Sequence, residues 1–240
     1  MPGMINKVIS LALVAISSSL VVQQAHAQTV PKKQCATSVH AIIARGQGPG
    51  NNLNVMVKVQ NMILDQIPGS TSLGLPYAHD AEDKFTAVHN GAIMMQNYVN
   101  DYLKVCRDSK IALIGYSLGA VTMMEAVCGT SSALLIPTQP FDPSLNKAII
   151  AAIAYGDETY VPLQPWNVGD CTIGLGIFPR LLPSTCDPFA SSLQSYCDYG
   201  DDQCCGIYPL DDNAAHHDYV DKYSQDVVNF IKGRLDGSIN

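Results

Sequence analysis

Residues 111–128 read IALIGYSLGAVTMMEAVC, and this stretch decides the fold. Its first part is a short apolar run that predicts a buried strand, and its last part has the length and composition of a helix. Between them lies GYSLG at 115–119, a Gly-x-Ser-x-Gly turn. Glycines two residues before and two after the serine leave room for a sharp turn that lifts the hydroxyl out of the sheet edge. This order of strand, turn and helix predicts a nucleophile at Ser117.

The chain on either side alternates between strand-length apolar runs and longer helical patterns. Strands are predicted at 39–44, 111–116 and 148–155, with a weaker one at 72–75. Helices are predicted at 54–66, 85–106, 118–128 and 219–235. Such alternation predicts an α/β fold, a three-layer α/β/α sandwich with a central, mainly parallel sheet. Between 162 and 210 the pattern dissolves, and we expect disulfides rather than regular hydrogen bonding to hold that segment.

The first 27 residues have the features of a secretory signal. Lys7 precedes an apolar run from Val8 to Val22, and Ala25-His26-Ala27 gives a small-x-small cleavage pattern. Serines interrupt the run, which is shorter than the roughly 20 apolar residues that span a bilayer. We therefore expect a signal at 1–27, one mature domain at 28–240, secretion, and no stable membrane insertion.

The cysteine content favours disulfides over a metal site, and the net charge argues against binding to nucleic acid. Eight cysteines all follow the expected cleavage point: Cys35, Cys106, Cys128, Cys171, Cys186, Cys197, Cys204 and Cys205. An even number in an exported chain predicts disulfides, and no repeated Cys-x2-Cys frame or Cys-His ligand register suggests a metal. The 14 basic residues against 21 acidic ones leave a net charge of −7, which argues against a nucleic-acid partner.

A serine nucleophile needs a base and an acid. In α/β-hydrolase folds these follow in the order serine, acid, histidine. Only His216 and His217 follow Ser117, and order alone does not choose between them. Five aspartates in the cysteine-rich stretch before them are candidates for the acid, and order does not choose among these either: Asp198, Asp201, Asp202, Asp211 and Asp212.

Together these residues resemble the secreted cutinase and acetylxylan esterase family of small, lidless, α/β-hydrolase-like serine esterases. The resembling motifs are Ala44-Arg45 after the first strand, GYSLG at 115–119, Gly156-Asp157, Ser195-Tyr196-Cys197-Asp198, Cys204-Cys205-Gly206 and the closing helix. They cover essentially the whole mature chain. The paired Cys204-Cys205 is more similar to the acetylxylan esterase branch.

The resemblance implies which acid and base act. The family's acid begins an Asp-x-x-Cys step, which matches Asp201, with Asp202 as the fallback. Its base begins a His-x-x-Tyr step with a second tyrosine four residues on, which matches His216. His217 misses that register by one residue. The resemblance also implies a disulfide between Cys35 and Cys106.

The family's oxyanion hole resembles a pair of backbone N–H groups. One follows the nucleophile, here Leu118, and the other comes shortly after the first strand, here Gln47, with Gly46 or Gly48 as alternatives. Many relatives have Gln where this chain has Leu118, but since a backbone N–H acts there, the hole is expected to survive.

The expected activity is hydrolysis of carboxylic esters through an acyl-enzyme, with neither cofactor nor metal, by a monomer. The resemblance implies short-chain acyl esters, acetylated xylan or cutin as substrates, the last two being plant cell-wall polymers. The alternative is a secreted carbohydrate- or surface-binding protein that kept the fold without turnover.

Overall fold

A computed structural model describes residues 35–50, 52–206 and 213–239 of the 240-residue chain. The expected signal at 1–27 lies outside the described residues. The family-like motifs from Ala44 to the closing helix lie within them.

The centre of the fold is a sheet of six strands, all pairing in parallel in the order β2-β1-β3-β4-β6-β5. The strands are β1 (Val39–Ala44), β2 (Thr71–Gly74), β3 (Lys110–Tyr116), β4 (Ile149–Tyr155), β5 (Asn167–Val168) and β6 (Leu193–Tyr196). Tyr116, Tyr155 and Tyr196 stand side by side at the ends of β3, β4 and β6. The residues that follow these three strands therefore meet at one edge of the sheet.

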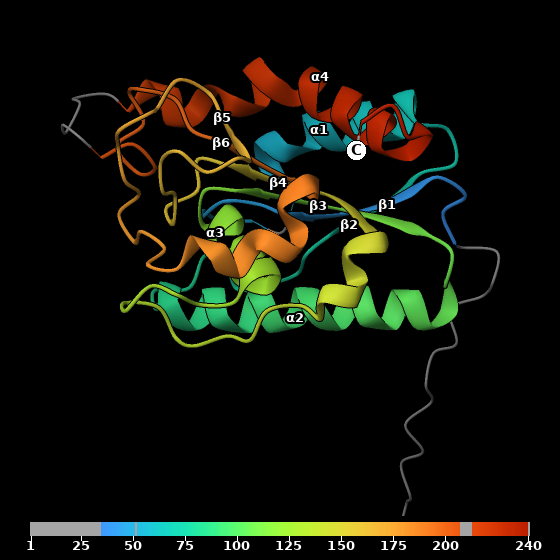
Figure 1. Cartoon of the computed structure of the whole chain (residues 1–240), viewed down its shortest axis with the longest axis horizontal. Helices are drawn as coiled ribbons and strands as arrows, with labels where there is room; N and C mark the ends of the chain where they lie inside the picture. The colour runs from blue at the N-terminus through green and yellow to red at the C-terminus, as the bar shows by residue number, and fades with distance from the viewer. Residues whose placement is uncertain (1–34, 51, 207–212, 240) are drawn as a thin grey trace, which may run out of the picture. The chain divides into compact units, whose positions relative to one another are not determined.

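Helices cover both faces of the sheet (Figure 1). They are α1 (Val57–Gln66), α2 (Lys84–Val105), α3 (Leu118–Cys128) and α4 (Ala214–Asp236), with 3₁₀ segments η2 (Asn54–Met56), η3 (Pro143–Lys147) and η4 (Pro183–Ser192). Helices α1 and α4 lie on one face and α2 and α3 on the other (Figure 1). The predicted three-layer α/β/α architecture is confirmed.

The strands are apolar on both sides because each side is covered. Ile42 and Leu113 pack in the core that includes α2 and α3, whereas Ile43 and Ile114 pack in the core that includes α1 and α4. Successive side chains of a strand point to opposite faces, so a strand buried on both faces reads as a continuous apolar run. This is why the runs at 39–44 and 111–116 were sufficient to predict β1 and β3.

The expectation for residues 162–210 is wrong in part. The segment holds β5, β6 and η4, and β6 pairs with β4 in a regular parallel ladder. Strand β6 reads LQSY, and four residues with a polar pair in the middle show neither alternation nor an apolar run. Helix α4 begins at Ala214, five residues before the predicted start, so His216 lies in its first turn.

Four disulfides join all eight cysteines: Cys35–Cys106, Cys128–Cys186, Cys171–Cys205 and Cys197–Cys204. The expected Cys35–Cys106 pairing is confirmed. The other three disulfides each have at least one end in residues 162–210, so covalent bridges do hold this segment, alongside its strands. Among the described helices, none combines the length and apolar character needed to cross a bilayer.

Candidate active site

Ser117 occupies a sharp turn between β3 and α3. Its backbone lies in the left-handed half of conformational space, with φ 53° and ψ −125°, which is uncommon for a residue with a side chain. Its N–H donates to the carbonyl of Tyr155 on the next strand (2.8 Å). A β-carbon on Gly119 would lie 2.1 Å from the carbonyl oxygen of Ala44, so the start of α3 packs directly on the end of β1. This close packing holds the strained turn in place.

Three side chains from distant parts of the chain form one hydrogen-bonded series. The Oγ of Ser117 lies 2.9 Å from Nε2 of His216, and Nδ1 of His216 lies 2.9 Å from Oδ2 of Asp201. His216 is 6% exposed and Asp201 is fully buried. The structure thus brings Ser117, Asp201 and His216 together.

Asp201 is surrounded by hydrogen-bond donors. The N–H groups of Gln203 and Cys204 donate to its Oδ1 at 2.8 and 3.3 Å, and the Tyr219 hydroxyl donates to Oδ2 at 2.8 Å. Burial acts to raise the pKa of Asp201, but the His216 contact and these donors together hold that pKa below its ordinary value. The carboxyl group is therefore ionised at neutral pH.

An ionised carboxylate can only accept hydrogen bonds, so Nδ1 of His216 must carry the hydrogen it shares with Asp201. In neutral imidazole the other nitrogen then has a free lone pair. Nε2 can accordingly accept the hydroxyl hydrogen of Ser117. This arrangement suits removal of the serine proton by the histidine.

The alternative acid and base do not join this series. The Asp202 carboxylate accepts from its neighbour Gln203 at 2.6 Å. The His217 ring is exposed, with Nδ1 3.4 Å from the Tyr116 hydroxyl.

The two residues expected to supply oxyanion donors belong to segments that adjoin the nucleophile. Leu118 is the first residue of α3, where backbone N–H groups have no partner within the helix. A β-carbon on Gly46 would come within 3.2 Å of the Ser117 β-carbon, so the turn that carries Gln47 lies against Ser117. The buried Arg45 guanidinium braces this turn by donating to the carbonyls of Pro49, Gly50 and Asn52.

A comparison with protein families adds an independent finding. The family model for cutinase matches residues 35–235. The chain belongs to the cutinase family.

Relatives of this cutinase-family chain include cutinases and acetylxylan esterases. It is 31% identical to "Cutinase 11" of Verticillium dahliae over 214 residues, which cover 85% of this chain and 71% of that protein. It is 30% identical to the acetylxylan esterase of Hypocrea jecorina over 222 residues, which cover 87% of this chain and 70% of that protein. The solved catalytic core of the Trichoderma reesei acetyl xylan esterase superposes with a TM-score of 0.73 at 28% identity, covering 83% of this chain and all of that one. This cutinase-family chain is a carboxylic ester hydrolase.

Sequence reasoning missed two residues of the site. Tyr219 links two acids, because its hydroxyl donates to Asp201 and accepts from the N–H of Asp198 at 2.9 Å. Gly156 follows β4 and lies against the histidine and the acid. Both stood in the motifs that carried the family resemblance, but a motif does not tell which atoms a residue contacts.

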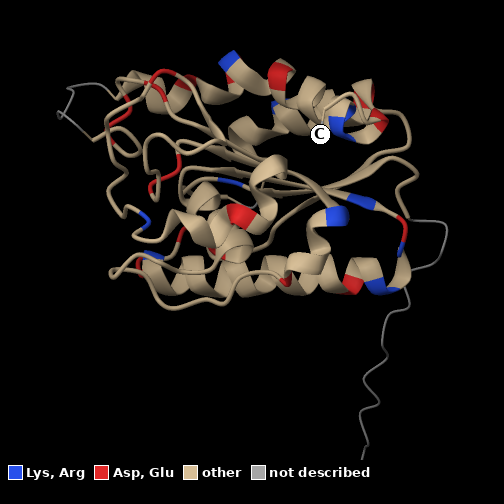
Figure 2. Ribbon diagram, viewed as in Figure 1, with Lys and Arg blue, Asp and Glu red and all other residues tan. Residues whose placement is uncertain are grey.

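The loops around the site carry acidic side chains (Figure 2). The acids in the loops after β4, β5 and β6 include Asp157, Glu158, Asp170, Asp198, Asp201 and Asp202. Their charges are not all free: burial raises the pKa of Asp157 and Glu158, and Asp198 pairs with Lys222.

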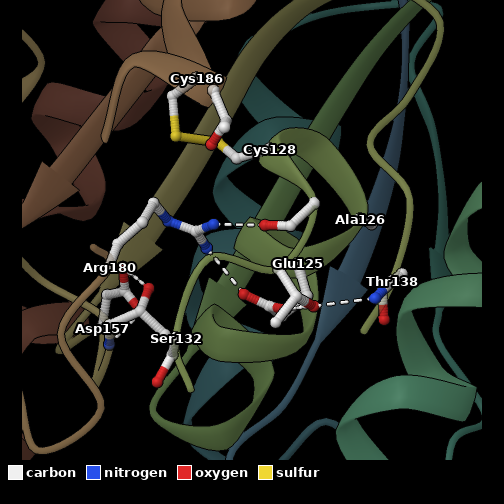
Figure 3. A network of polar contacts seen from close by, with 12 residues as sticks. Glu125, Ala126, Cys128, Ser132, Thr138, Asp157, Arg180 and Cys186 are labelled. Atoms are coloured by element: carbon white, nitrogen blue, oxygen red, sulfur yellow. Dashed lines mark hydrogen bonds and ion pairs between the residues drawn. A yellow bond between two sulfur atoms is a disulfide. The ribbon is translucent and has the colours of Figure 1, made fainter. Parts of the chain in front are cut away.

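A buried ion pair holds α3, the helix that directly follows Ser117. Arg180 donates to Oε1 of Glu125 at 2.8 Å, and the two side chains are 3% and 1% exposed. The same guanidinium donates to the carbonyl of Gly129, just after the helix. Figure 3 shows Arg180 pointing at Glu125, with the Cys128–Cys186 disulfide close by. The end of α3 is thus tied both covalently and electrostatically to the segment between β4 and β6.

Proposed function

We propose that this carboxylic ester hydrolase is an exported serine esterase in which Ser117 is the nucleophile, His216 the base and Asp201 the acid. The observation that carries the proposal is the continuous series of 2.9 Å contacts from Ser117 Oγ through His216 to Asp201. Nucleophile, base and orienting acid in hydrogen-bond reach are what acyl transfer requires.

The first half of the reaction forms an acyl-enzyme. Ser117 Oγ attacks the ester carbonyl carbon while its proton passes to Nε2 of His216. The C–O bond to the alcohol then breaks, and the alcohol oxygen takes that proton. Asp201 keeps the imidazole in the right tautomer and stabilises its positive charge.

The second half returns the enzyme to its starting state. Water attacks the acyl carbon and gives a proton to His216. The bond to Ser117 Oγ breaks, Oγ regains the proton, and the acid leaves. The same groups act in both halves, so no cofactor is needed.

The negative oxygen that forms in each half needs donors. We assign the N–H of Leu118 and a donor at Gln47 to this role, since Leu118 opens α3 and the Gly46 turn lies against Ser117. The N-terminal end of α3 adds its positive dipole at the same place. Loss of one such donor typically lowers kcat by about 100- to 1000-fold.

The proposed substrates are esters with short acyl chains, with acetylated xylan or cutin as the natural polymers. The relatives named cutinase and acetylxylan esterase support both polymers.

Export is the proposed destination, with cleavage after Ala27 to leave one domain at 28–240. Four disulfides support it, because such bonds persist in oxidising compartments. The family match at 35–235 supports a single domain after the signal.

Hydrolysis of p-nitrophenyl acetate, butyrate and palmitate by the mature chain tests the proposal, with acetylated xylan and cutin assayed in parallel. Ser117→Ala should lower kcat by more than about a thousandfold while the protein still folds. Ser191→Ala, at an exposed serine of η4, is the control and should stay within twofold. Wild-type turnover in Ser117→Ala would refute the assignment of the nucleophile.

A further inference from the structure

A cavity of about 320 Å³ lies next to the nucleophile turn. Its walls are mostly apolar and come from both helices on that face of the sheet and from two loops: Phe85, Val88, Leu118, Val121, Leu135 and Phe178. Leu118 directly follows Ser117 in the chain, so one residue of the cavity wall is the immediate neighbour of the nucleophile. An acetyl group has two carbon atoms and would fill only a small part of this space.

Four ionisable residues also line the cavity: Glu82, Asp83, Lys84 and Glu158. The first three are exposed, and Glu158 is the buried one. Glu158 is 8% exposed. Within residues 35–50, 52–206 and 213–239, no hydrogen bond or ion pair reaches its carboxyl oxygens. Burial raises the pKa of Glu158 to about 7. The positive charges of His216 and Lys84 act to lower that pKa and the negative charges of Asp157 and Asp201 act to raise it, so the carboxyl group lies near the triad.

The carboxyl oxygens of Glu158 are not among the fully enclosed, unpartnered side-chain atoms of the described residues, so they keep some contact with open space. A carboxyl group that has lost most of its water and makes no hydrogen bond is nevertheless costly. A ligand that brings a hydroxyl group into the cavity would remove that cost. The hydroxyl can donate to the ionised carboxylate or accept from the protonated acid. A purely hydrocarbon chain of the same length would leave the carboxyl group unpaired.

The position of the base indicates which part of the ester enters the cavity. His216 must protonate the departing alcohol, and it belongs to α4, on the face of the sheet opposite to α2 and α3 (Figure 1). The cavity wall is built from α2 and α3. This arrangement favours departure of the alcohol on the α4 side, with the acyl chain extending toward the cavity.

We propose that this cavity is the acyl subsite and that Glu158 selects acyl chains of medium length that carry a hydroxyl group. The apolar walls hold the carbon chain, and the Glu158 carboxyl group pairs with the hydroxyl. The proposal rests on Ser117 and His216 acting as proposed above.

The test compares kcat/KM for the p-nitrophenyl esters of acetate, hexanoate and 6-hydroxyhexanoate. The wild type should prefer 6-hydroxyhexanoate to hexanoate. Glu158→Leu, which replaces the carboxyl group by a hydrocarbon of similar size, should shift that ratio toward hexanoate by about 10- to 100-fold. Acetate is too short to reach the carboxyl group, so its kcat/KM in each variant is the reference to which the values for the two longer esters are normalised.

Two further variants separate the role of Glu158 from general effects. Glu158→Gln keeps a hydrogen-bonding group and should retain a preference for the hydroxylated ester. Asp65→Asn removes a carboxyl group from an exposed residue of α1 that does not line the cavity, and its ratio should stay within twofold of wild type. Thermal unfolding of each variant shows that it is folded.

Three outcomes would overturn the proposal. One is an unchanged ratio in folded Glu158→Leu, and another is an equal loss on all three esters. The third outcome concerns a second pair of esters, 2-hydroxyethyl butyrate and propyl butyrate, which differ only in the alcohol. If Glu158 caused a preference for the hydroxylated alcohol but none for the hydroxylated acyl chain, the alcohol and not the acyl chain would occupy the cavity. Failure of the proposed function is distinguishable, because the wild type would then hydrolyse none of these esters or Ser117→Ala would hydrolyse them all.

Discussion

The backbone of Gly156 lies directly against the imidazole of His216. A β-carbon added to Gly156 would come within 2.9 Å of His216 Nδ1 and 3.0 Å of Asp201 Oδ2. These two atoms form the hydrogen bond that orients the ring. The end of β4 is thus one wall of the triad, and any side chain there would push the histidine away from the acid.

Gly156→Ala should therefore lower kcat by about 10- to 100-fold with little change in KM, because a displacement of about 1 Å in a catalytic group can cost that much. Gly156 has φ +58°, so alanine also strains the backbone. Gly237→Ala is the matched control, with φ +77° and no atom within 4 Å of the added carbon. Equal kcat values for Gly156→Ala and Gly237→Ala would contradict the wall role.

Tyr219→Phe should lower kcat about tenfold and leave KM unchanged, because Asp201 loses a donor and can shift relative to His216. Stability should fall by about 1–3 kcal/mol, since the N–H of Asp198 also loses its acceptor. Tyr223→Phe is the control, because its hydroxyl contacts the Asp198 carboxylate and not Asp201. Steady-state kinetics on p-nitrophenyl butyrate measure both, and a normal kcat in Tyr219→Phe would show that Asp201 does not depend on this hydroxyl.

Asp201→Asn should lower kcat by about 10³- to 10⁴-fold, because an amide cannot hold the same histidine tautomer. Asp202→Asn, one residue along, should stay within a few fold, since that carboxylate contacts Gln203 and not His216. The pair of variants decides between the two adjacent acids. The reverse ranking of the two kcat values would exclude Asp201 as the acid.

Arg180→Met should destabilise the protein by about 3–5 kcal/mol, because it leaves the Glu125 carboxylate buried and unpaired. Adding Glu125→Gln should restore part of that loss, since no uncompensated charge remains. Urea unfolding with disulfides intact gives the free energies. If the double variant were as unstable as the sum of the two single variants, the ion pair would not be the cause.

Glu158 should make the protein less stable as the pH rises from about 4.5 to about 7. Its ordinary pKa is 4.5 and burial raises the pKa to about 7, so the folded state holds the proton over a range where the unfolded state has released it. The difference amounts to on the order of 3 kcal/mol. Glu158→Gln should remove this decline, as measured by urea unfolding at several pH values, and an unchanged slope would mean that the carboxyl group ionises normally.

The strands and helices that could be predicted are those whose burial produces a recognisable apolar run in the sequence. Strands β1, β3 and β4 are apolar on both faces, and α3 is buried along its whole length, so each reads as an apolar run of characteristic length. Strand β6 forms because its backbone pairs with β4, and its own composition does not predict a strand. The early start of α4 was missed because its first five residues, AAHHD, lack the apolar spacing that begins at Tyr219.

Chain order and the spacing of residues within motifs were sufficient to predict Ser117, Asp201 and His216 as site residues. Ser117 stands in a turn that local sequence determines, whereas its contact with His216 spans 99 residues and depends on how the sheet edge assembles. The walls of the site come from that assembly as well. Gly156 lies next to the triad and Glu158 lies in the cavity wall because β4 ends beside β3. No local sequence pattern predicts that pairing of strands.

The disulfide between Cys197 and Cys204 closes a short loop with Asp201 inside it, and the Cys204 N–H also donates to that acid. A newly made chain with reduced thiols lacks this closure, so its acid is not yet fixed beside the base. Oxidation of Cys197 and Cys204 therefore adds a covalent limit on how far Asp201 can move from His216, beside the hydrogen bonds from Gln203 and Tyr219.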